Sequence, residues 1–240
     1  MTTLHLQNLV KAYGGKNVVN SVNLNVKNGD VVGLLGPNGA GKTTTFYMTV
    51  GMIKPDKGRV LLDDEDITDY PMFLRARKGV GYLPQETSIF RKLTVQQNVL
   101  AILEILPISV AERLERANML LEELGINHLS DQKAHLLSGG EKRRLEISRS
   151  LATNPSFILL DEPFAGIDPL AVNDIKNIIA HLKLRGIGIL ISDHNVRDTL
   201  GVCDEAYILC EGEVIESGSP EKIASSEAAI RAYLGDEFTL

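Results

Sequence analysis

The stretch that most constrains the fold of this chain is VVGLLGPNGAGKT, residues 31–43. Its first part is a short continuous apolar run, which is typical of a strand buried on both faces of a sheet. A loop with glycines at positions 36, 39 and 41 follows, and a helix is predicted from about Lys42 to Met52. A strand of this kind needs helices on both sides, so the stretch predicts an α/β fold.

The rest of the chain repeats this pattern. Short apolar strands are predicted at VGYLP, FILLDE, IGILIS and AYILC, and helical stretches separate several of them. In one of these stretches Ile175, Ile178 and Leu182 recur at helical intervals before Gly186. The alternation of buried strands and helices predicts a mostly parallel sheet that is covered on both faces.

Three regions differ from this pattern. Val22, Leu24 and Val26 alternate as in a strand with one buried face, and a hairpin is predicted to turn at Glu211-Gly212. From about Thr94 to Leu151 the pattern is helical only, with Gly125 as a C-cap. We interpret about residues 90–153 as a helical subdomain inserted into the α/β core of a single domain that spans residues 1–240.

Composition excludes several classes of protein. The net charge of −6 over 240 residues does not favour nucleic-acid binding. The start of the chain lacks the pattern of a signal peptide, and no apolar run approaches the ~18 residues of a membrane span. We therefore expect a cytoplasmic protein that reaches a membrane only through partners, with Cys203 and Cys210 as free thiols.

The first glycine-rich loop fits a phosphate-binding loop. Phosphate oxygens need several N–H donors at close range, and glycines let the backbone approach them at the start of a helix. Lys42 is expected to reach the β- and γ-phosphates, and Thr43 is expected to bind Mg²⁺. The residues predicted to bind nucleotide here are Gly36, Pro37, Asn38, Gly39, Ala40, Gly41, Lys42, Thr43 and Thr44.

An acidic pair follows the predicted strand FILLDE. Because ligands bind at the carboxyl ends of strands in open α/β sheets, Asp161 is predicted to hold Mg²⁺ and Glu162 to polarise the attacking water. The alternative is that both acids are solvated at the end of a strand.

A second glycine pair opens another predicted helix, in LSGGE. Ser138 and Glu141 form a capping box, but this explains neither Gly139 nor Gly140, because glycine in a first turn costs up to ~1 kcal/mol. If the pair binds phosphate, it should serve the nucleotide of another molecule. The basic residues that follow, Lys142, Arg143 and Arg144, are expected to form a solvated helix face.

With these motifs in this order, the chain resembles the ATP-binding cassette family. Tyr13 in KAYGG matches the aromatic residue that stacks on adenine, and Gln85 in YLPQE matches the glutamine that senses Mg²⁺ and the γ-phosphate. Asp168 in AGIDP matches a residue that touches the partner subunit, and His194 in ISDHNV matches a histidine that contacts the γ-phosphate.

The resemblance implies a phosphate-loop nucleotide-binding domain with a RecA-like core, a small antiparallel β subdomain and a helical subdomain. It also implies a head-to-tail homodimer that hydrolyses ATP with Mg²⁺. Each ATP would lie between the phosphate loop of one chain and Ser138, Gly139 and Gly140 of the other, so that hydrolysis loosens the pair.

Three further stretches, GYLPQETSIFRKLTVQQN among them, are similar to the members of this family that power lipopolysaccharide export. That resemblance implies inner-membrane permease partners and a peripheral place on the cytoplasmic face of the inner membrane. The permease would be contacted near Ile89, Phe90 and Arg91. Phe90 and Arg91 would help to transmit the conformational change of the ATPase to the permease. Alternatively, the apolar pair Ile89-Phe90 serves helix capping or core packing.

Other functions remain open at this point. The same motor could serve branched-chain amino acid import or another lipid. A mechanochemical ATPase that acts on DNA or ribosomes is disfavoured by the negative charge and the single cassette. A catalytically silent nucleotide-binding module is disfavoured by Glu162 and His194, and a GTPase by the lack of an Asn-Lys-x-Asp motif.

Overall fold

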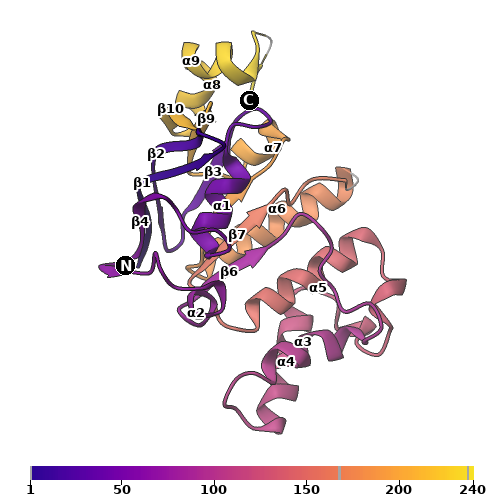
Figure 1. Ribbon diagram of the computed structural model, residues 1–240. Coiled ribbons are helices and arrows are strands. Elements are labelled where there is room, and N and C mark those ends of the chain that lie inside the picture. The colour runs from indigo at the N-terminus through magenta and orange to yellow at the C-terminus, as the bar shows by residue number, and fades with distance from the viewer. Residues whose placement is uncertain (1, 167–168, 237) are drawn as a thin grey trace.

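The computed structural model describes residues 2–166, 169–236 and 238–240, and it contains two sheets (Figure 1). The larger sheet has six strands in the order β10-β9-β3-β8-β7-β6. All neighbours in it are parallel except β9 and β10. The predicted mostly parallel sheet is therefore confirmed. Its strands are β3 (Val31–Leu35), β6 (Val80–Leu83), β7 (Phe157–Asp161), β8 (Gly188–Ser192), β9 (Glu205–Cys210) and β10 (Glu213–Gly218).

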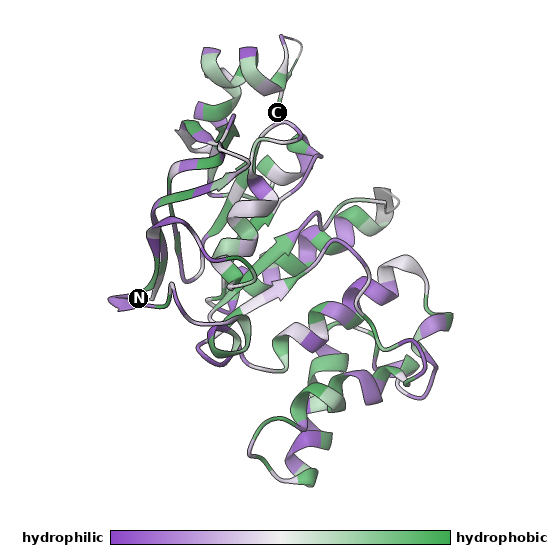
Figure 2. Ribbon diagram, in the orientation of Figure 1, coloured by the Kyte–Doolittle hydropathy of each residue, from purple (hydrophilic) through white to green (hydrophobic). Residues whose placement is uncertain are grey.

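Both faces of this sheet are buried, and its central strands are hydrophobic along their length (Figure 2). Successive strand residues point to opposite faces, so Ile158 packs into one apolar cluster and Leu159 into another. The first cluster includes residues of α6 (Pro169–Leu184), and the second includes residues of α1 (Lys42–Val50). Helix α1 ends two residues earlier than predicted because Gly51 has a left-handed φ of 83°.

The smaller sheet is antiparallel, in the order β2-β1-β4-β5. The predicted alternating strand corresponds to β2, in which Val22, Leu24 and Val26 are buried against the α1 side of the larger sheet. The four strands are β1 (Thr3–Tyr13), β2 (Lys16–Lys27), β4 (Lys57–Leu62) and β5 (Glu65–Asp66), and the short helix α2 (Met72–Arg77) follows them.

Three helices lie between β6 and β7 in the chain, at one end of the molecule (Figure 1). They are α3 (Val95–Leu103), α4 (Val110–Glu123) and α5 (Gly139–Leu151), with short 3-10 turns η1 (Asn127–Leu129) and η2 (Ala134–Leu136). Thr94 caps α3 in a capping box with Gln97, and Gly125 follows α4 with a φ of 68°. Leu103 and Leu145 share one apolar cluster with Ile158 of the sheet, so the helices and the sheet have a common core. The subdomain boundaries at about 90–153 stay a prediction.

The C-terminal part packs against the edge of the larger sheet. The predicted hairpin is confirmed, since Glu211 and Gly212 both have left-handed φ values between β9 and β10. After β10 come α8 (Pro220–Ser225), α9 (Glu227–Ala229) and the π-helix η3 (Ile230–Leu234). Cys203 and Cys210 are free thiols, and no helix in the described ranges is long and apolar enough to span a bilayer.

Candidate active site

The phosphate-binding loop lies between β3 and α1, as predicted. Gly36 and Gly41 have left-handed φ values of 149° and 106°. A Cβ at Gly36 would lie 2.0 Å from the Leu209 carbonyl oxygen, and one at Gly41 would lie 2.4 Å from the Val18 carbonyl oxygen. The loop therefore requires glycine at both positions, because its backbone is pressed between β2 and β9.

Lys42, the first residue of α1, lies across the loop. Its ammonium donates to the carbonyl oxygens of Gly36 at 2.6 Å and Pro37 at 3.0 Å. Burial lowers the pKa of Lys42, and the carboxylates of Glu162 and Asp161 oppose this shift. The buried Lys42 ammonium in this loop suits a ligand with several negative charges.

A pocket of about 230 Å³ opens over this loop. Its lining residues are Val18, Asn38, Gly39, Ala40, Gly41, Lys42, Thr43, Thr44, Glu162 and His194. The pocket brings together the predicted phosphate-binding residues with Glu162 and His194, which lie more than a hundred positions further along the chain.

Glu162 is held by two of the other predicted residues. One carboxylate oxygen of Glu162 lies 2.7 Å from His194 Nε2, and the other accepts a hydrogen bond from Gln85 Nε2 at 2.5 Å. These three side chains come from the ends of β7, β8 and β6, which are neighbours at the carboxyl edge of the sheet. The arrangement can orient a carboxylate as a general base beside bound phosphate.

The backbone at Glu162 is strained. Its φ of 48° is in the left-handed region, which costs a non-glycine residue about 1–3 kcal/mol. The backbone N–H of Glu162 donates to the Ser192 carbonyl oxygen at 2.6 Å. Next to Ser192, the buried Asp193 accepts from the backbone N–H groups of Phe164 and Asn195, both at 2.8 Å. These bonds tie the loops after β7 and β8 together and so fix Glu162 against His194.

Asp161 ends β7 and is buried, and burial raises its pKa. The Tyr82 hydroxyl donates to its Oδ2 at 3.2 Å. The Thr43 hydroxyl has no hydrogen-bond partner within the described part of the chain, and Gln85 and Asp161 offer further oxygen atoms. Hydroxyl, amide and carboxylate oxygens are the donors that Mg²⁺ prefers, so these three residues fit such an ion.

Helix α5 begins with the second glycine pair. Ser138 Oγ accepts from the Glu141 backbone N–H at 3.4 Å, and Glu141 accepts from the Ser138 backbone N–H at 2.7 Å. A Cβ at Gly139 would meet no heavy atom of the described chain within 4 Å, and one at Gly140 would meet only Ala171 Cβ at 3.7 Å. Neither glycine has a left-handed φ. Nothing in the described part of the chain therefore explains why both are glycine.

The other predicted residues lie around this centre. Tyr13 is 49% exposed at the end of β1, with the Lys11 ammonium 5.7 Å from its ring centre. Asp168 lies outside the described residues. Ile89 is buried among the core residues of the helical segment, so the packing alternative holds for it, whereas Phe90 and Arg91 are exposed.

The expectation of a solvated basic face on α5 is wrong for Arg143. This residue is 7% exposed and its guanidinium donates to Glu146 at 3.2 Å. It also donates to the carbonyl oxygens of Pro84 and Asp161, so it lies under the site rather than in water. Arg144 pairs with Asp174 at 2.8 Å. The position of Arg143 three residues before Glu146 was the available signal for this buried pair.

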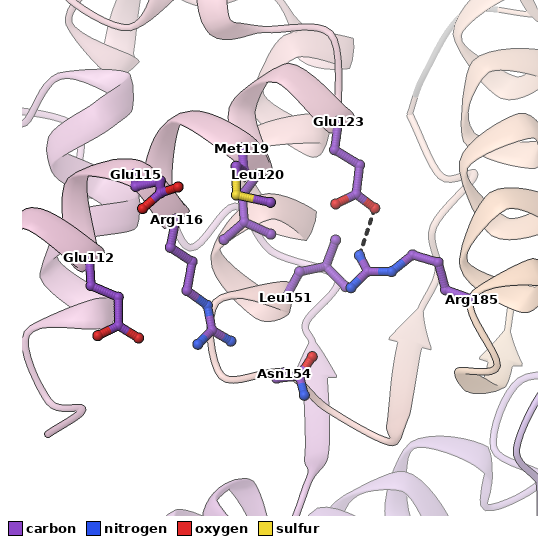
Figure 3. Close-up of a pocket in the computed structure, with 9 residues that line it drawn as sticks. All are labelled: Glu112, Glu115, Arg116, Met119, Leu120, Glu123, Leu151, Asn154 and Arg185. Atoms are coloured by element: carbon purple, nitrogen blue, oxygen red, sulfur yellow. Dashed lines mark hydrogen bonds and ion pairs between the residues drawn. The ribbon is translucent and has the colours of Figure 1, made fainter. Parts of the chain in front are cut away.

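A larger hollow of about 430 Å³ lies elsewhere, between α4, the end of α5 and α6 (Figure 3). Arg185 points across it toward Glu123, and the two side chains are 2.6 Å apart. None of the predicted site residues lines this hollow. The candidate active site is therefore the smaller pocket at the phosphate loop.

Comparison with known proteins identifies the family. The family model for ABC transporters matches residues 19–165, which include the phosphate loop, Gln85, the second glycine pair and Glu162. The chain belongs to the ABC transporter family. It is an ATP-binding ATPase subunit of this family, and the ordered motifs of the sequence predicted that identity correctly.

The relatives of this ABC ATPase match it over its full length. It is 56% identical to the lipopolysaccharide export system ATP-binding protein LptB of Escherichia coli (strain K12), over 100% of both chains. The ADP conformation of MJ1267, an ATP-binding cassette of an ABC transporter, matches 98% of this chain and 100% of that chain at a TM-score of 0.89 and 33% identity.

A third relative is the ATP-binding cassette MJ0796 in a dimeric, post-hydrolysis state bound to ADP and Pi. It matches with a TM-score of 0.78 and 27% identity, over 92% of this chain and 99% of that chain. The predicted fold of an ABC ATPase is thus confirmed by solved structures.

Proposed function

We propose that this ABC ATPase powers the export of lipopolysaccharide from the inner membrane of a Gram-negative cell. The observation that supports this cargo is the 56% identity to LptB over the full length of both chains. The partners would be inner-membrane permease subunits, and the ATPase would lie on the cytoplasmic face of that membrane.

The residues of the site would divide the chemistry among them. The backbone N–H groups of residues 36–44, except that of Pro37, which has none, and the Lys42 ammonium would bind the phosphates, and exposed Tyr13 would stack on the adenine. Mg²⁺, held by Thr43, Asp161 and Gln85, would neutralise charge on the β- and γ-phosphates. Glu162 would accept a proton from the attacking water, which is worth about 10²- to 10⁴-fold, and His194 would contact the γ-phosphate.

Two chains would complete each site. The supporting observation is that, among the described residues, neither a lack of space nor the φ angle explains Gly139 and Gly140. Bare N–H groups at a helix start bind anions, so Ser138, Gly139 and Gly140 would bind the ATP held by the partner's phosphate loop. Asp168 would lie at the same interface. Charge-assisted hydrogen bonds contribute about 1.5–3 kcal/mol each, so loss of the γ-phosphate would loosen the pair.

The permease would dock beside the segment that follows Gln85. Phe90 is 43% exposed although its backbone is fixed, since its N–H donates to Asn98 Oδ1 at 2.8 Å. An exposed aromatic ring on a fixed backbone, next to the Arg91 side chain, suits a contact with a partner helix. Ile89 would support this contact from the core.

Isolation of the native complex tests the cargo. The tagged chain is purified in detergent from its own cells with the permeases attached, and bound lipid is analysed by mass spectrometry. We expect lipopolysaccharide to co-purify with the permeases. With the Phe90→Ala variant, the amounts of both the permeases and the lipopolysaccharide should be strongly reduced. Co-purification with a periplasmic amino-acid-binding protein and no lipopolysaccharide would refute the assigned cargo.

A Glu162→Gln variant tests the catalytic role. The amide still fills the space between Gln85 and His194 but cannot take a proton. We expect it to bind Mg-ATP, to accumulate as a dimer by light scattering, and to release phosphate at least about 100-fold more slowly. Turnover at the wild-type rate would remove Glu162 as the general base.

A further inference from the structure

The half-buried side chain of Tyr82 contacts the carboxylate of Asp161. Its hydroxyl donates to Asp161 Oδ2 at 3.2 Å, and no other described residue donates to this carboxylate. Asp161 is only 5% exposed. A buried carboxylate depends on its hydrogen bonds, so the Tyr82 hydroxyl determines how this one is turned. The second oxygen, Oδ1, has no donor in the described part of the chain and is available to a ligand.

The register of the large sheet brings these two side chains together. Tyr82 of β6 lies opposite Leu159 of β7. Because side chains alternate along a strand, Asp161 lies on the same face as Leu159, two residues before it. This is the face covered by α1, since Leu159 shares an apolar cluster with Phe46 and Tyr82 packs against that cluster. The bond between Tyr82 and Asp161 is therefore fixed by two paired strands rather than by a loop.

Helix α1 holds the Tyr82 ring from the other side. The Tyr47 ring meets it edge to face, with the ring centres 6.5 Å apart and the planes at 88°. Tyr47 follows Thr43 by four residues, so both lie along one side of α1. Tyr82 also precedes Gln85 by three residues on the same segment. Tyr82 thus lies among the three elements that carry Thr43, Gln85 and Asp161, the residues that fit Mg²⁺.

We propose that Tyr82 is a positioning residue for the divalent cation, because its hydroxyl holds Asp161 Oδ2 and so keeps Oδ1 available to the cation bound with ATP. The proposal rests on the Mg²⁺ role of Asp161 in the proposed function. Without the hydroxyl, the carboxylate could rotate, and cation binding would have to fix its orientation. Removing a side chain that hydrogen-bonds to a metal ligand typically lowers metal affinity by about 10- to 100-fold.

Single-atom variants test the proposal. Tyr82→Phe removes the hydroxyl and keeps the ring and its contact with Tyr47. Tyr70→Phe is the matched control, because Tyr70 is also half-buried and its hydroxyl also donates to a carboxylate, that of Glu65, at 3.1 Å. Glu65 belongs to β5, the last strand of the small sheet, and not to the site.

Asp161→Asn provides the reference for loss of the carboxylate charge. Every variant carries Glu162→Gln as well, so that ATP is not consumed during the measurement. Mn²⁺, which replaces Mg²⁺ as a spectroscopic probe, is titrated into the ATP-loaded chain after free nucleotide has been removed, and electron paramagnetic resonance reports the free ion. The affinity for a fluorescent ATP analogue is measured separately in EDTA.

The two titrations separate positioning of the cation ligand from general damage to the site. We expect Tyr82→Phe to weaken Mn²⁺ binding about 10-fold, toward the value of Asp161→Asn, while nucleotide affinity in EDTA stays within about twofold. Tyr70→Phe should change neither affinity. A role of Tyr82 in packing alone would leave the Mn²⁺ affinity of Tyr82→Phe unchanged, because the ring still fills its space.

Two results would overturn the proposal. One is a Mn²⁺ affinity of Tyr82→Phe equal to that of the chain with Tyr82 intact, and the other is an equal loss in Tyr70→Phe. If Asp161→Asn binds Mn²⁺ as tightly as the chain with Asp161 intact, the cation role of Asp161 in the proposed function is itself refuted. A loss in Asp161→Asn without a loss in Tyr82→Phe refutes only the role of Tyr82.

Discussion

Glu162 shows at the scale of one residue how the site is built. Both of its carboxylate oxygens are engaged, by Gln85 and by His194, and its backbone has a left-handed φ of 48°. These two bonds and the strained backbone hold the side chain in one orientation. Preorganisation of this kind lowers the cost of aligning the base with water during the reaction.

The glycines of the two loops differ in what they do, and alanine distinguishes them. Gly139→Ala places a Cβ in open space, so we expect an unchanged or slightly higher Tm and normal ATP binding by the single chain. ATP-driven pairing should be lost, because the Cβ blocks the approach of the partner's phosphates. Thermal unfolding, nucleotide titration and light scattering measure these three properties.

Gly41→Ala is the contrasting variant. Its Cβ would lie 2.4 Å from the Val18 carbonyl oxygen, so this change should lower the Tm and abolish ATP binding. If Gly139→Ala lowered the Tm as much as Gly41→Ala, the second glycine pair would have a role within the chain, contrary to our interpretation.

At the scale of elements, side-chain ion pairs connect the helical segment to α6. Glu123 of α4 contacts both Arg185 at 2.6 Å and His181 at 2.8 Å, beside the hollow of Figure 3. Exposed pairs of this kind contribute about 0.2–1 kcal/mol each. They are therefore strong enough to bias the position of α4 and weak enough to break when the helices move.

We predict that Glu123→Gln loosens α4 without unfolding the protein. Its Tm should fall by only a few degrees or less, while amide hydrogen exchange should rise in α4 and in the end of α6. Lys176→Gln is the matched control, because Lys176 of α6 pairs instead with Asp198 of α7 (Val196–Leu200) at 2.6 Å. Faster exchange of α4 in the control, or unchanged exchange in Glu123→Gln, would contradict this.

The elements after β10 have a titratable anchor. Hydrogen bonds from Lys222, Ser226 and the Ser217 backbone lower the pKa of Glu216 from 4.5 to about 2. Since the folded pKa lies below the unfolded one, the ionised carboxylate stabilises the fold fully above about pH 4.5, and this contribution is lost as the pH falls toward 2.

We therefore predict that α8 and α9 loosen between about pH 4.5 and 2, and that Glu216→Gln makes this region insensitive to pH over that range. NMR titration of the Glu216 carboxyl carbon, with hydrogen exchange of α8 at each pH, measures both effects. A Glu216 titration midpoint at the ordinary value of 4.5 would show that the anchor does not exist.

At the scale of the whole molecule, the chain has a phosphate loop in one place and an unexplained glycine pair in another. The pocket of about 230 Å³ at the phosphate loop does not include Ser138, Gly139 or Gly140 among its lining residues. A symmetric pair of chains would bring each glycine pair to the other's pocket, with the same contacts made twice.

Mixing two inactive variants tests the crossed arrangement. Lys42→Ala chains lack a working phosphate loop, and Gly139→Ala chains lack a working glycine pair. In an equal mixture half of the pairs are mixed, and each mixed pair has one intact pocket, so ATPase activity of up to about a quarter of the wild-type rate should return. A mixture as inactive as either variant alone, with mixed pairs shown by native mass spectrometry, would argue against shared sites.

Much of the fold and most of the site could be predicted from the sequence. The continuous apolar runs predicted β3, β7 and β8, the alternation predicted β2, and Ser138 with Glu141 predicted a capping box that the structure contains. These predictions succeed because periodicity, caps and left-handed glycines depend on residues close together in the chain.

Other features depended on which distant segments meet. Asp193 joins two loops, Ile89 packs inside, and Arg143 lies buried under the Gln85 segment although its neighbours suggested a solvated face. The sequence by itself determined which chemical groups the protein has and the order in which its strands and helices form. Only the tertiary structure decided which charges are buried and which carboxylate Gln85 and His194 share, because burial and long-range hydrogen bonds depend on packing between segments that no local pattern records.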